Sequence, residues 1–565
     1  MLTCKTYRKI FLNIALFVIN HARDWRRKGL CMASLIDTAG GEKKLYDIFI
    51  IGGGVNGCGV ARDAAGRDLS VALAEMNDIA SATSSSSTKL FHGGLRYLEH
   101  FEFRLVREAL IEREVLLKAM PHISWPLRFV LPYSRKMRFE INTPLSHFLA
   151  LLFPWMKGRR PAWLIRFGLF LYDYMGARKI LPPTKVIDLK SDKTGNPLKD
   201  SFLRAFEYSD CWVEDSRLVI LNARDAKRRG AHILPRTEVV CAERQDRCWR
   251  ILTKNTETGE SSTFLARCLI NAAGPWVEDI IKNKVKQRSS GELRLVRGSH
   301  IVTRKLYDHE KSYLFQGEDG RVIFTIPYET DFTLIGTTDV DHSDLSQQPF
   351  CSEEEKDYLL AFASSYFRTA VQRTDIVASF SGVRPLYNDG AINASNATRD
   401  YFLRLDDEND IPLVNIFGGK ITTYRKLAES VMKALTPFFS NMSGNWTAGV
   451  PLPGGDFPVD GFGQLLSDIE EKYHFLPDGV AWRLARAYGT DTWVILGEAR
   501  SLDDLGEDFG AGVYAVELNW CIKREWVSSA EDFVWRRTRR GLLLSAEQVT
   551  KINNYVELNR VRLTT

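Results

Sequence analysis

Residues 46–57 constrain the fold of this chain more than any other segment. An apolar run at 48–51 is typical of a buried strand, and it breaks into Gly52-x-Gly54-x-x-Gly57. A helix-like stretch follows at 60–65, and a second strand-like run ends at Glu75 about twenty residues after the glycines. This order of strand, glycine turn, helix and carboxylate predicts a dinucleotide-binding βαβ unit.

Each of these residues has its own physical task. Gly52 permits the tight turn, Gly54 lets the backbone approach a pyrophosphate, and Gly57 lets the helix pack closely on the strand. Free N–H groups at the start of the helix favour phosphate oxygens. Glu75 can accept hydrogen bonds from a ribose diol. The alternative is a glycine-rich turn without a ligand, which the full context disfavours.

Composition limits the classes of protein to consider. A chain of 565 residues is too long for one core, so we expect two or three domains. The net charge of +6 is small for this length, and without a zinc-finger or RNA-binding motif we predict no nucleic-acid partner. Nine cysteines without a C-x-x-C pair indicate reduced thiols in a cytosolic compartment and no metal site.

Residues 1–43 differ from the rest as an N-terminal extension. Their apolar run, at 10–19, is too short to span a bilayer. A signal peptide is disfavoured because the basic cluster follows that run and no A-x-A site is present. Two interpretations remain, an interfacial amphipathic anchor and a start of translation at Met32, and we favour the second.

Residues 135–180 mix basic, aromatic and apolar side chains. Such a mixture suits the membrane interface, where rings lie at headgroup level and cations meet anionic lipid. A buried helix pair with solvated charges explains the pattern equally well, so both interpretations stay open. The basic members are Arg135, Lys136, Arg138, Lys157, Arg159, Arg160 and Arg166.

Other segments outline the remaining organisation. The Ser-rich run at 81–88 is either a flexible linker or, as we favour, a ligand-binding loop. Apolar spacing predicts a helix over 103–120, ended by Pro121. Strand patterns dominate 291–380 and predict a mainly antiparallel sheet. A Pro- and Gly-rich boundary at 451–458 precedes a region with helical spacing.

Together these segments resemble the FAD-dependent glycerol-3-phosphate dehydrogenases, of the D-amino-acid-oxidase-like superfamily. The resemblance covers about residue 44 to the C-terminus, and residues 136–158 look longer than the family usually carries. The motifs that carry it are Ile51-Gly-Gly-Gly-Val-Asn-Gly57, Ala82-Thr-Ser-Ser-Ser-Ser87 with Lys89, His92-Gly-Gly-Leu-Arg-Tyr-Leu-Glu99, Phe206-Glu-Tyr-Ser-Asp210, Asn271-Ala-Ala-Gly-Pro-Trp276, Gly298-Ser-His300, Ile335-Gly-Thr-Thr-Asp339, Ser381-Gly-Val-Arg-Pro385, Thr398-Arg-Asp400, Phe417-Gly-Gly-Lys420, Asp504-Leu-Gly-Glu-Asp-Phe509 and Trp535-Arg-Arg-Thr538.

The resemblance implies an α/β + α fold class. We expect a Rossmann-like FAD-binding domain over 44–290, with a basic and apolar membrane-facing insertion at about 135–180. An antiparallel-sheet substrate or cap domain would occupy 291–380, the chain would return to the FAD-binding domain over 381–440, and a C-terminal helical domain would form 441–565.

The reaction implied is oxidation of the C2 hydroxyl of sn-glycerol 3-phosphate to dihydroxyacetone phosphate, with hydride transfer to FAD. The substrate is a dianion, so fixed cations are needed, and Arg offers phosphate a planar fork of donors. Expected substrate residues are Arg96, Tyr97, Arg384 and Arg399, and expected catalytic residues are His300, Arg384 and Lys420. Expected cofactor residues are Gly52, Gly54, Asn56, Gly57, Glu75, Thr83, Ser84, Ser87, Lys89, His92, Gly93, Gly94, Gly274, Gly419, Lys420 and Thr422.

Several alternatives stay open within this resemblance. His300 and His92 are both candidates to accept the hydroxyl proton, and we favour His300; Arg384 and Lys420 could instead lower the pKa of the alcohol without a dedicated histidine. The electron acceptor is a membrane quinone, which we favour, or oxygen in an oxidase. A scaffold that binds nucleotide, and use of NAD in place of FAD, are further alternatives.

The resemblance also bears on location. The tail has no D-x-D-x-D-G-x₅-E calcium loop, which mitochondrial relatives carry. We therefore expect a bacterial-type enzyme at the membrane surface, peripheral on the cytoplasmic face of the inner membrane. Formation of a homodimer is left open.

Overall fold

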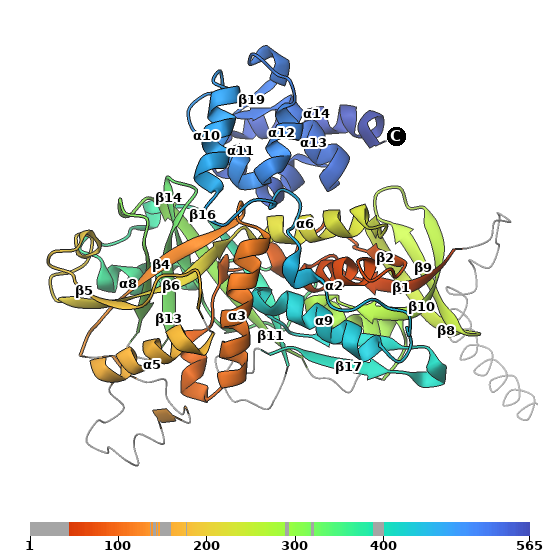
Figure 1. Ribbon diagram of the computed structural model, residues 1–565, viewed down its shortest axis with the longest axis horizontal. Helices are drawn as coiled ribbons and strands as arrows, with labels where there is room; N and C mark the ends of the chain where they lie inside the picture. The colour runs from red at the N-terminus through yellow and green to blue at the C-terminus, as the bar shows by residue number, and fades with distance from the viewer. Residues whose placement is uncertain are drawn as a thin grey trace, which may run out of the picture.

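The computed structural model describes residues 44–564 except 136, 139–142, 144, 147–159, 177, 289–292, 318–320 and 388–399. The predicted extension at 1–43, part of the insertion at 135–180, and Arg399 therefore lie outside the described residues. Figure 1 shows two sheet-based parts side by side and a helical part above them.

The first sheet has a parallel centre in the order β18-β10-β1-β2-β7. Helices α2, α6 and α9 pack into its apolar core. This arrangement confirms the predicted Rossmann-like α/β fold. The elements are β1 (Leu45–Ile51), α2 (Val55–Ala65), β2 (Val71–Ala74), α6 (Asp215–Arg228), β7 (His232–Leu234), β8 (Thr237–Gln245), β9 (Cys248–Asn255), β10 (Ser261–Asn271), β17 (Phe402–Asp406), β18 (Leu413–Phe417) and α9 (Tyr424–Leu435).

The second sheet is mostly antiparallel, in the order β15-β11-β14-β13-β12-β4-β6-β3, with β16 on β11 and β5 on β6. It includes strands from outside the range 291–380 that was predicted for it. The prediction failed there because strands that pair across the whole chain leave no local pattern that reveals the pairing. Its strands are β3 (Leu90–Phe91), β4 (Ser124–Pro132), β5 (Lys185–Asp188), β6 (Arg204–Val213), β11 (Leu293–Arg304), β12 (Ser312–Gln316), β13 (Val322–Tyr328), β14 (Phe332–Gly336), β15 (Val340–Asp341) and β16 (Ile376–Tyr387).

Helices cover both faces of this second sheet. Helices α3 (Phe103–Ala119) and α5 (Ala162–Met175) share an apolar cluster with one face, whereas α8 (Glu353–Tyr366) shares another cluster with the opposite face. The bounds of α3 confirm the helix predicted over 103–120. Ser352 and Glu355 form a reciprocal capping box that begins α8.

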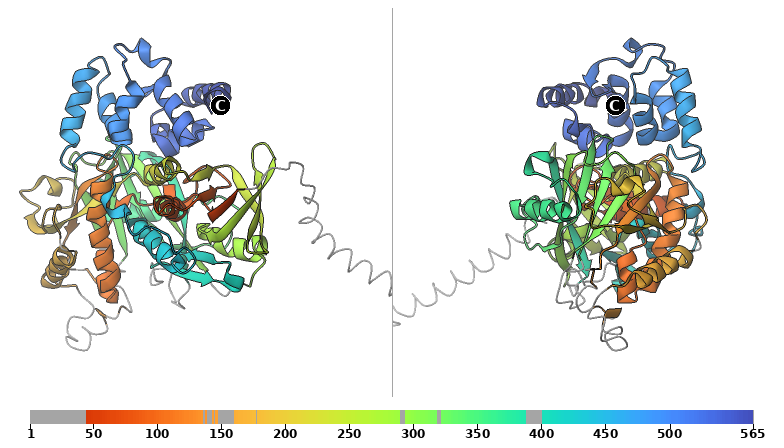
Figure 2. Two further views of the ribbon diagram at one scale, coloured as in Figure 1. Left: turned by 45° about the vertical axis from the view of Figure 1, so that its right-hand side comes forward. Right: turned by 90° about the vertical axis from the view of Figure 1, so that its left-hand side faces the viewer.

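The C-terminal domain has an apolar core of its own, and Figure 2 shows it resting on one end of the sheet-based parts. It consists of α10 (Phe462–Lys472), α11 (Val480–Tyr488), α12 (Thr492–Leu496), α13 (Ala515–Glu525), α14 (Ala546–Thr564) and a hairpin, β19 (Asp508–Gly510) with β20 (Val513–Tyr514). The predicted helical domain is confirmed.

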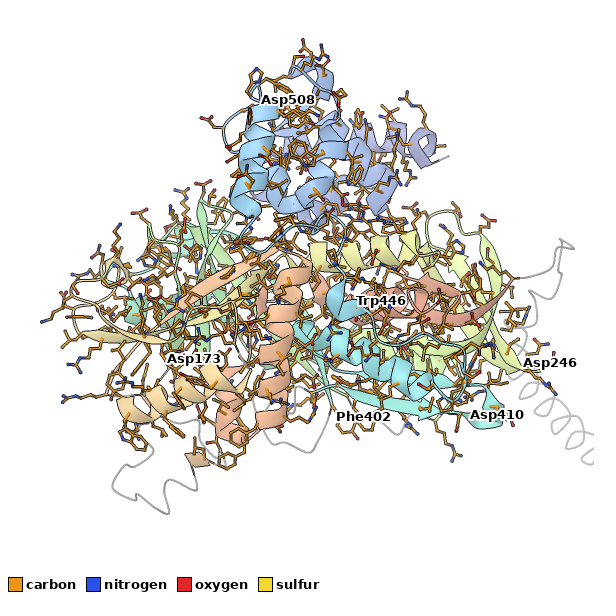
Figure 3. All side chains as sticks on the ribbon, viewed as in Figure 1. Asp173, Asp246, Phe402, Asp410, Trp446 and Asp508 are labelled. Carbon is orange, nitrogen blue, oxygen red and sulfur yellow. The ribbon has the colours of Figure 1, made fainter. Side chains whose placement is uncertain are left out.

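Trp446 fixes the segment that leads to this domain (Figure 3). Its indole N–H donates to the carbonyl of Asp63 on α2 at 3.1 Å. The guanidinium carbons of Arg62 and Arg229 lie 4.9 Å and 4.0 Å from the ring centroid. Cation–π contact on a ring anchored to α2 therefore ties the connecting segment to the first sheet domain.

Candidate active site

The glycine turn brings α2 close to the end of β1. A Cβ on Gly57 would lie 1.9 Å from the Gly52 carbonyl oxygen, so only glycine allows this contact between helix and strand. Gly52 itself has φ of +107°, and a Cβ there would lie 2.6 Å from the Ala272 carbonyl oxygen. Gly54 precedes the first turn of α2, where an added Cβ would approach only the Ser84 hydroxyl, at 3.2 Å. Backbone at Gly54 is therefore open to a ligand.

Glu75 follows β2 and faces the same turn. One carboxylate oxygen accepts the Gly53 N–H at 2.7 Å, and the other accepts the Asn77 N–H at 2.9 Å. Burial raises the pKa of Glu75, and the two backbone donors oppose that shift. The carboxylate is thus held beside the glycine turn, in the position that ribose recognition requires.

The Ser-rich loop lies against the N-terminus of α2. The Ser84 hydroxyl accepts the Val55 N–H at 3.0 Å, and the Thr83 hydroxyl donates to the Val383 carbonyl at 2.6 Å. Lys89, predicted as a cofactor residue, does not line the cavity beside this loop. Its fully buried ammonium contacts both carboxylate oxygens of Asp215 at 2.9 Å, so Lys89 holds the loop from beneath. Burial lowers the pKa of Lys89 to about 8.

A cavity of about 300 Å³ opens beside this loop, between the two sheet-based parts. Many predicted site residues line this cavity. They come from the Ser-rich loop, from the segment after β3, and from the motifs at 381–385 and 417–420. The predicted residues that line the cavity are Thr83, Ser84, Ser87, His92, Gly94, Arg96, Tyr97, Arg384, Gly419, Lys420 and Thr422.

Apart from the three glycines of the fingerprint, the predicted cofactor residues Gly93 and Gly274 also do not line the cavity. Gly93 packs against α3 and α5, and its N–H donates to the Tyr172 hydroxyl at 2.8 Å. Gly274 begins a short 3₁₀ turn with φ of +57°, and no atom lies within 4 Å of its Cβ position. Gly93 therefore serves packing, whereas the open position of Gly274 suits backbone contact with a ligand.

Basic side chains from three separate segments, Arg96, Arg384 and Lys420, line the cavity. Arg384, on β16, forms an ion pair with Asp339 and donates to the Thr337 hydroxyl at 2.9 Å. Gly298 makes room for it, because a Cβ there would lie 2.3 Å from a guanidinium nitrogen of Arg384. The ammonium of Lys420 lies 3.7 Å from the centroid of the Tyr97 ring.

Sequence reasoning missed Arg160 as a member of this site. Arg160 lines the cavity, pairs with Glu99, and donates to Gln316 at 2.8 Å. Burial and the charge of Arg96 lower the pKa of Arg160 to about 9. Arg160 belongs in sequence to the basic stretch at 135–180, and no local pattern there indicates its pairing with Glu99.

Of the two candidate histidines, His92 lines the cavity and His300 does not. His300 lies on β11, 1% exposed, with its ring stacked 4.9 Å from that of Phe380. Its Nε2 atom lies 3.0 Å from the Thr88 hydroxyl, and Thr88, not His300, lines the cavity. His92 does line it. His300 thus hydrogen-bonds a residue of the cavity lining without being part of that lining, and its contact with substrate stays a prediction.

Burial, followed by the charges of Arg384 and Lys89, lowers the pKa of His300 to about 3. The folded protein keeps this imidazole neutral, whereas the unfolded chain binds a proton below about pH 6.5. Stability from this group is complete above that pH and is lost as the pH falls from about 6.5 towards 3. We expect a loss of about 1.4 kcal/mol between about pH 7.5 and 5.5.

Thermal unfolding of the parent and of His300→Gln at those two pH values measures this contribution. The drop in the unfolding temperature on acidification should be smaller in the variant. An equal drop in both proteins would contradict the neutral, buried imidazole.

The Asn56 Oδ1 and the Thr422 Oγ1 are buried polar atoms that lack a hydrogen-bond partner among the described residues. Asn56 uses its Nδ2 atom to donate to the Gly418 carbonyl at 3.1 Å. Gly418 and Gly419 have φ of +71° and +105°, which turns their backbone sharply before α9. Buried polar atoms in native proteins are almost always satisfied, so a polar ligand between α2 and this turn fits them.

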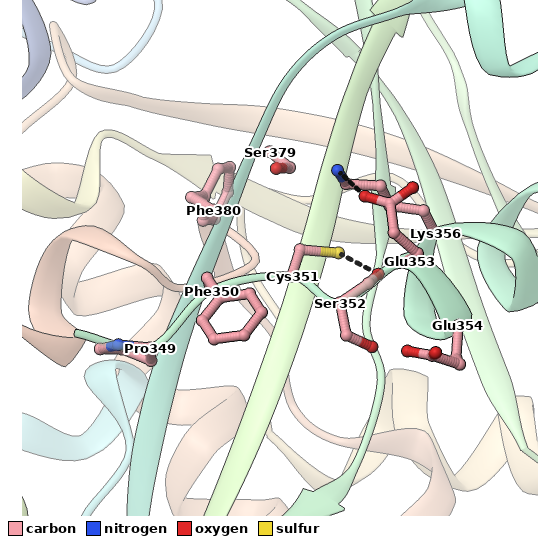
Figure 4. Close-up of a pocket in the computed structure, with 9 residues that line it drawn as sticks. All are labelled: Pro349, Phe350, Cys351, Ser352, Glu353, Glu354, Lys356, Ser379 and Phe380. Carbon is pink, nitrogen blue, oxygen red and sulfur yellow. Dashed lines mark hydrogen bonds and ion pairs between the residues drawn. The ribbon is translucent and has the colours of Figure 1, made fainter. Parts of the chain in front are cut away.

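A second hollow lies at the start of α8 (Figure 4). It is lined by Phe350 and Cys351 together with Ser379 and Phe380, and it contains no predicted site residue. Burial raises the pKa of the Cys351 thiol to about 11, so this thiol is protonated at neutral pH.

Comparison with known proteins decides the family. Residues 47–409 match the model described as FAD dependent oxidoreductase, and residues 445–560 match the C-terminal domain of alpha-glycerophosphate oxidase. The chain belongs to the FAD-dependent glycerol-3-phosphate dehydrogenase family. This confirms the resemblance noted in the sequence and makes FAD the dinucleotide that the site accommodates.

Relatives are similar over nearly their whole length. A D-erythritol 1-phosphate dehydrogenase of Brucella abortus is 47% identical over 92% of this chain and 99% of its own. The glycerol-3-phosphate dehydrogenase of Pseudomonas aeruginosa is 46% identical, with 91% and 95% covered. The structure of the glycerol-3-phosphate dehydrogenase from Bacillus halodurans complexed with FAD is similar with a TM-score of 0.66, 25% identity, and 92% and 95% covered.

Proposed function

We propose that this flavoprotein oxidises the C2 hydroxyl of sn-glycerol 3-phosphate, giving dihydroxyacetone phosphate. The observation that carries the proposal is the convergence of Arg96, Arg384 and Lys420 on one cavity beside the dinucleotide fingerprint. A small dianion needs fixed cations, and guanidinium groups match phosphate with paired donors. FAD, when bound, would accept the hydride.

Each residue has a distinct proposed role. Arg96 and Arg384 hold the phosphate, and the resemblance adds Arg399, which lies outside the described residues. Tyr97 and Lys420 form one wall, where the ammonium favours negative charge that develops during the reaction. His92, which lines the cavity, accepts the proton from the C2 hydroxyl. His300 holds Thr88, which also lines the cavity, by a hydrogen bond.

Anaerobic titration tests the proposal. Under argon, sn-glycerol 3-phosphate should bleach the visible flavin band, and dihydroxyacetone phosphate should form in equal amount. Flavin that stays oxidised would reject the proposal. The name of the Brucella abortus relative makes D-erythritol 1-phosphate the second candidate, so the two phosphates should be compared by kcat/KM.

A membrane quinone is the proposed electron acceptor, and α5 supplies the proposed membrane-facing surface. Trp163, Phe167, Phe170 and Tyr174 are all more than half exposed along one face of this helix, whereas Leu169 on the other face is fully buried. Figure 1 shows α5 at the end of the molecule opposite the C-terminal domain. Exposed aromatic rings along one helix suit the interface of a bilayer.

No helix in the described ranges combines the length and apolarity that crossing a bilayer requires. The proposed attachment through α5 is peripheral, on the cytoplasmic face of the bacterial inner membrane. A peroxide assay distinguishes the alternative acceptor, because an oxidase would release peroxide with glycerol 3-phosphate and would not need a quinone analogue.

Replacing both Phe167 and Phe170 with glutamate should weaken binding to anionic vesicles at least about 10-fold, since each buried ring contributes about 1.5–3 kcal/mol. Co-sedimentation measures binding, and activity with a soluble acceptor should be unchanged. Phe350→Glu is the matched control, because Phe350 is 62% exposed at the distant hollow of Figure 4. Equal binding by the double variant and the control would contradict the assignment of α5.

A further inference from the structure

Three arginines of the C-terminal domain reach loops of the FAD site. Arg536 and Arg537 end a π-helical turn, η13 (Asp532–Arg537), between α13 and α14, and Arg539 follows it. Arg537 and Arg539 are buried by more than 85%, although none of the three lines the cavity. Figure 1 shows this domain directly above α6.

The first contact is with Asp78, in the turn after Glu75. Arg537 donates to both carboxylate oxygens of Asp78, at 2.5 and 2.9 Å, and Arg536 adds a third donor at 2.6 Å. The same turn is tied to the glycine fingerprint, because Glu75 accepts the Gly53 N–H at 2.7 Å. The arginine pair therefore fixes the loop that presents the ribose-binding carboxylate.

The second contact is with Asp215, the first residue of α6. Arg539 forms an ion pair with one of its carboxylate oxygens. The other oxygen accepts the Ser87 hydroxyl at 2.8 Å and the Ser87 N–H at 3.1 Å. Asp215 is fully buried and also carries Lys89. A chain of charged hydrogen bonds thus runs from the C-terminal domain to Ser87, which lines the cavity.

We propose that Arg537 and Arg539 are positioning residues for FAD, through which the C-terminal helical domain clamps two loops of the cofactor site and raises its affinity. Loops that must be ordered on binding lose conformational entropy, and contacts that order them beforehand reduce this loss. Arg537 acts through Asp78 on the Glu75 loop, and Arg539 acts through Asp215 on the Ser-rich loop.

Arg539→Gln tests the second arm, because Lys89 keeps Asp215 paired in the variant. Apo-protein is titrated with FAD, and quenching of flavin fluorescence gives the dissociation constant. We expect an increase of at least about 10-fold, with an intermediate value for Arg539→Lys. Arg500→Gln, an exposed arginine of the same domain, is the control and should stay within twofold of the parent.

A double-variant cycle separates the clamp from general stabilisation. In a Ser87→Ala background the hydroxyl link to the loop is lost and the backbone N–H link remains, so Arg539→Gln should change FAD affinity by a smaller factor than in the parent. An equal effect in both backgrounds, or an unchanged dissociation constant in Arg539→Gln, would overturn the proposal. If the glutamine variant fails to fold, judged by thermal unfolding of the apo-protein, parental affinity in Arg539→Lys overturns it. No substrate enters these assays, so the result is independent of the proposed reaction.

Discussion

Arg384→Ala should lower kcat/KM for glycerol 3-phosphate by about 10²–10⁴-fold while FAD stays bound. The guanidinium is expected to donate two charge-assisted hydrogen bonds to substrate, each contributing about 1.5–3 kcal/mol. It lies over Gly298 and is fixed by Asp339 and Thr337, so its direction is set before substrate arrives. Steady-state kinetics and the flavin absorbance of the purified variant measure the two effects.

Two comparisons sharpen this test. Arg384→Lys keeps the charge but loses the fork of donors, so it should recover only part of the activity. Arg304→Ala removes an exposed arginine from the neighbouring strand β11 and should leave kcat/KM unchanged. Full activity in Arg384→Ala would remove this residue from the site.

Gly54→Val should abolish retention of FAD. The Gly54 backbone faces open space apart from the Ser84 hydroxyl, so a branched side chain would occupy the volume that the pyrophosphate needs. We expect colourless protein after reconstitution, with a dissociation constant raised more than about 10³-fold. Apo-protein unfolding should change little.

Gly463→Val is the control for that substitution, since no atom lies within 4 Å of its added Cβ on α10. It should bind FAD like the parent. A yellow, flavin-loaded Gly54→Val protein would contradict the assignment of the fingerprint.

Much of the fold was predictable because its signals are local. The glycine fingerprint, the apolar spacing of α3 and the Pro- and Gly-rich boundary before the C-terminal domain each depend on neighbouring residues. The extent of the second sheet was not predictable, since β4 (Ser124–Pro132) pairs with β6 (Arg204–Val213) and with β12 (Ser312–Gln316), both far along the chain. Pairing across such distances leaves no local pattern.

In the candidate site, too, local motifs were predictable from the sequence, whereas side-chain directions that depend on tertiary packing were not. Motifs identified Arg96, Arg384 and Lys420, which the fold brings to one cavity. Lys89 and His300 were predicted as a cofactor residue and a catalytic residue from their motifs, but their side chains lie against Asp215 and Phe380 and do not line the cavity. Which way a side chain points within a motif depends on tertiary packing.

The position of β1 at the centre of its sheet has a consequence for synthesis of the chain. β1 ends at Ile51, yet its neighbour β10 begins only at Ser261. At about 5–20 residues per second, a ribosome needs on the order of ten seconds or more to supply that partner. During this interval the nascent β1 has an apolar, unpaired edge, so correct assembly requires that this edge be shielded, and FAD can bind only after the later strands have emerged.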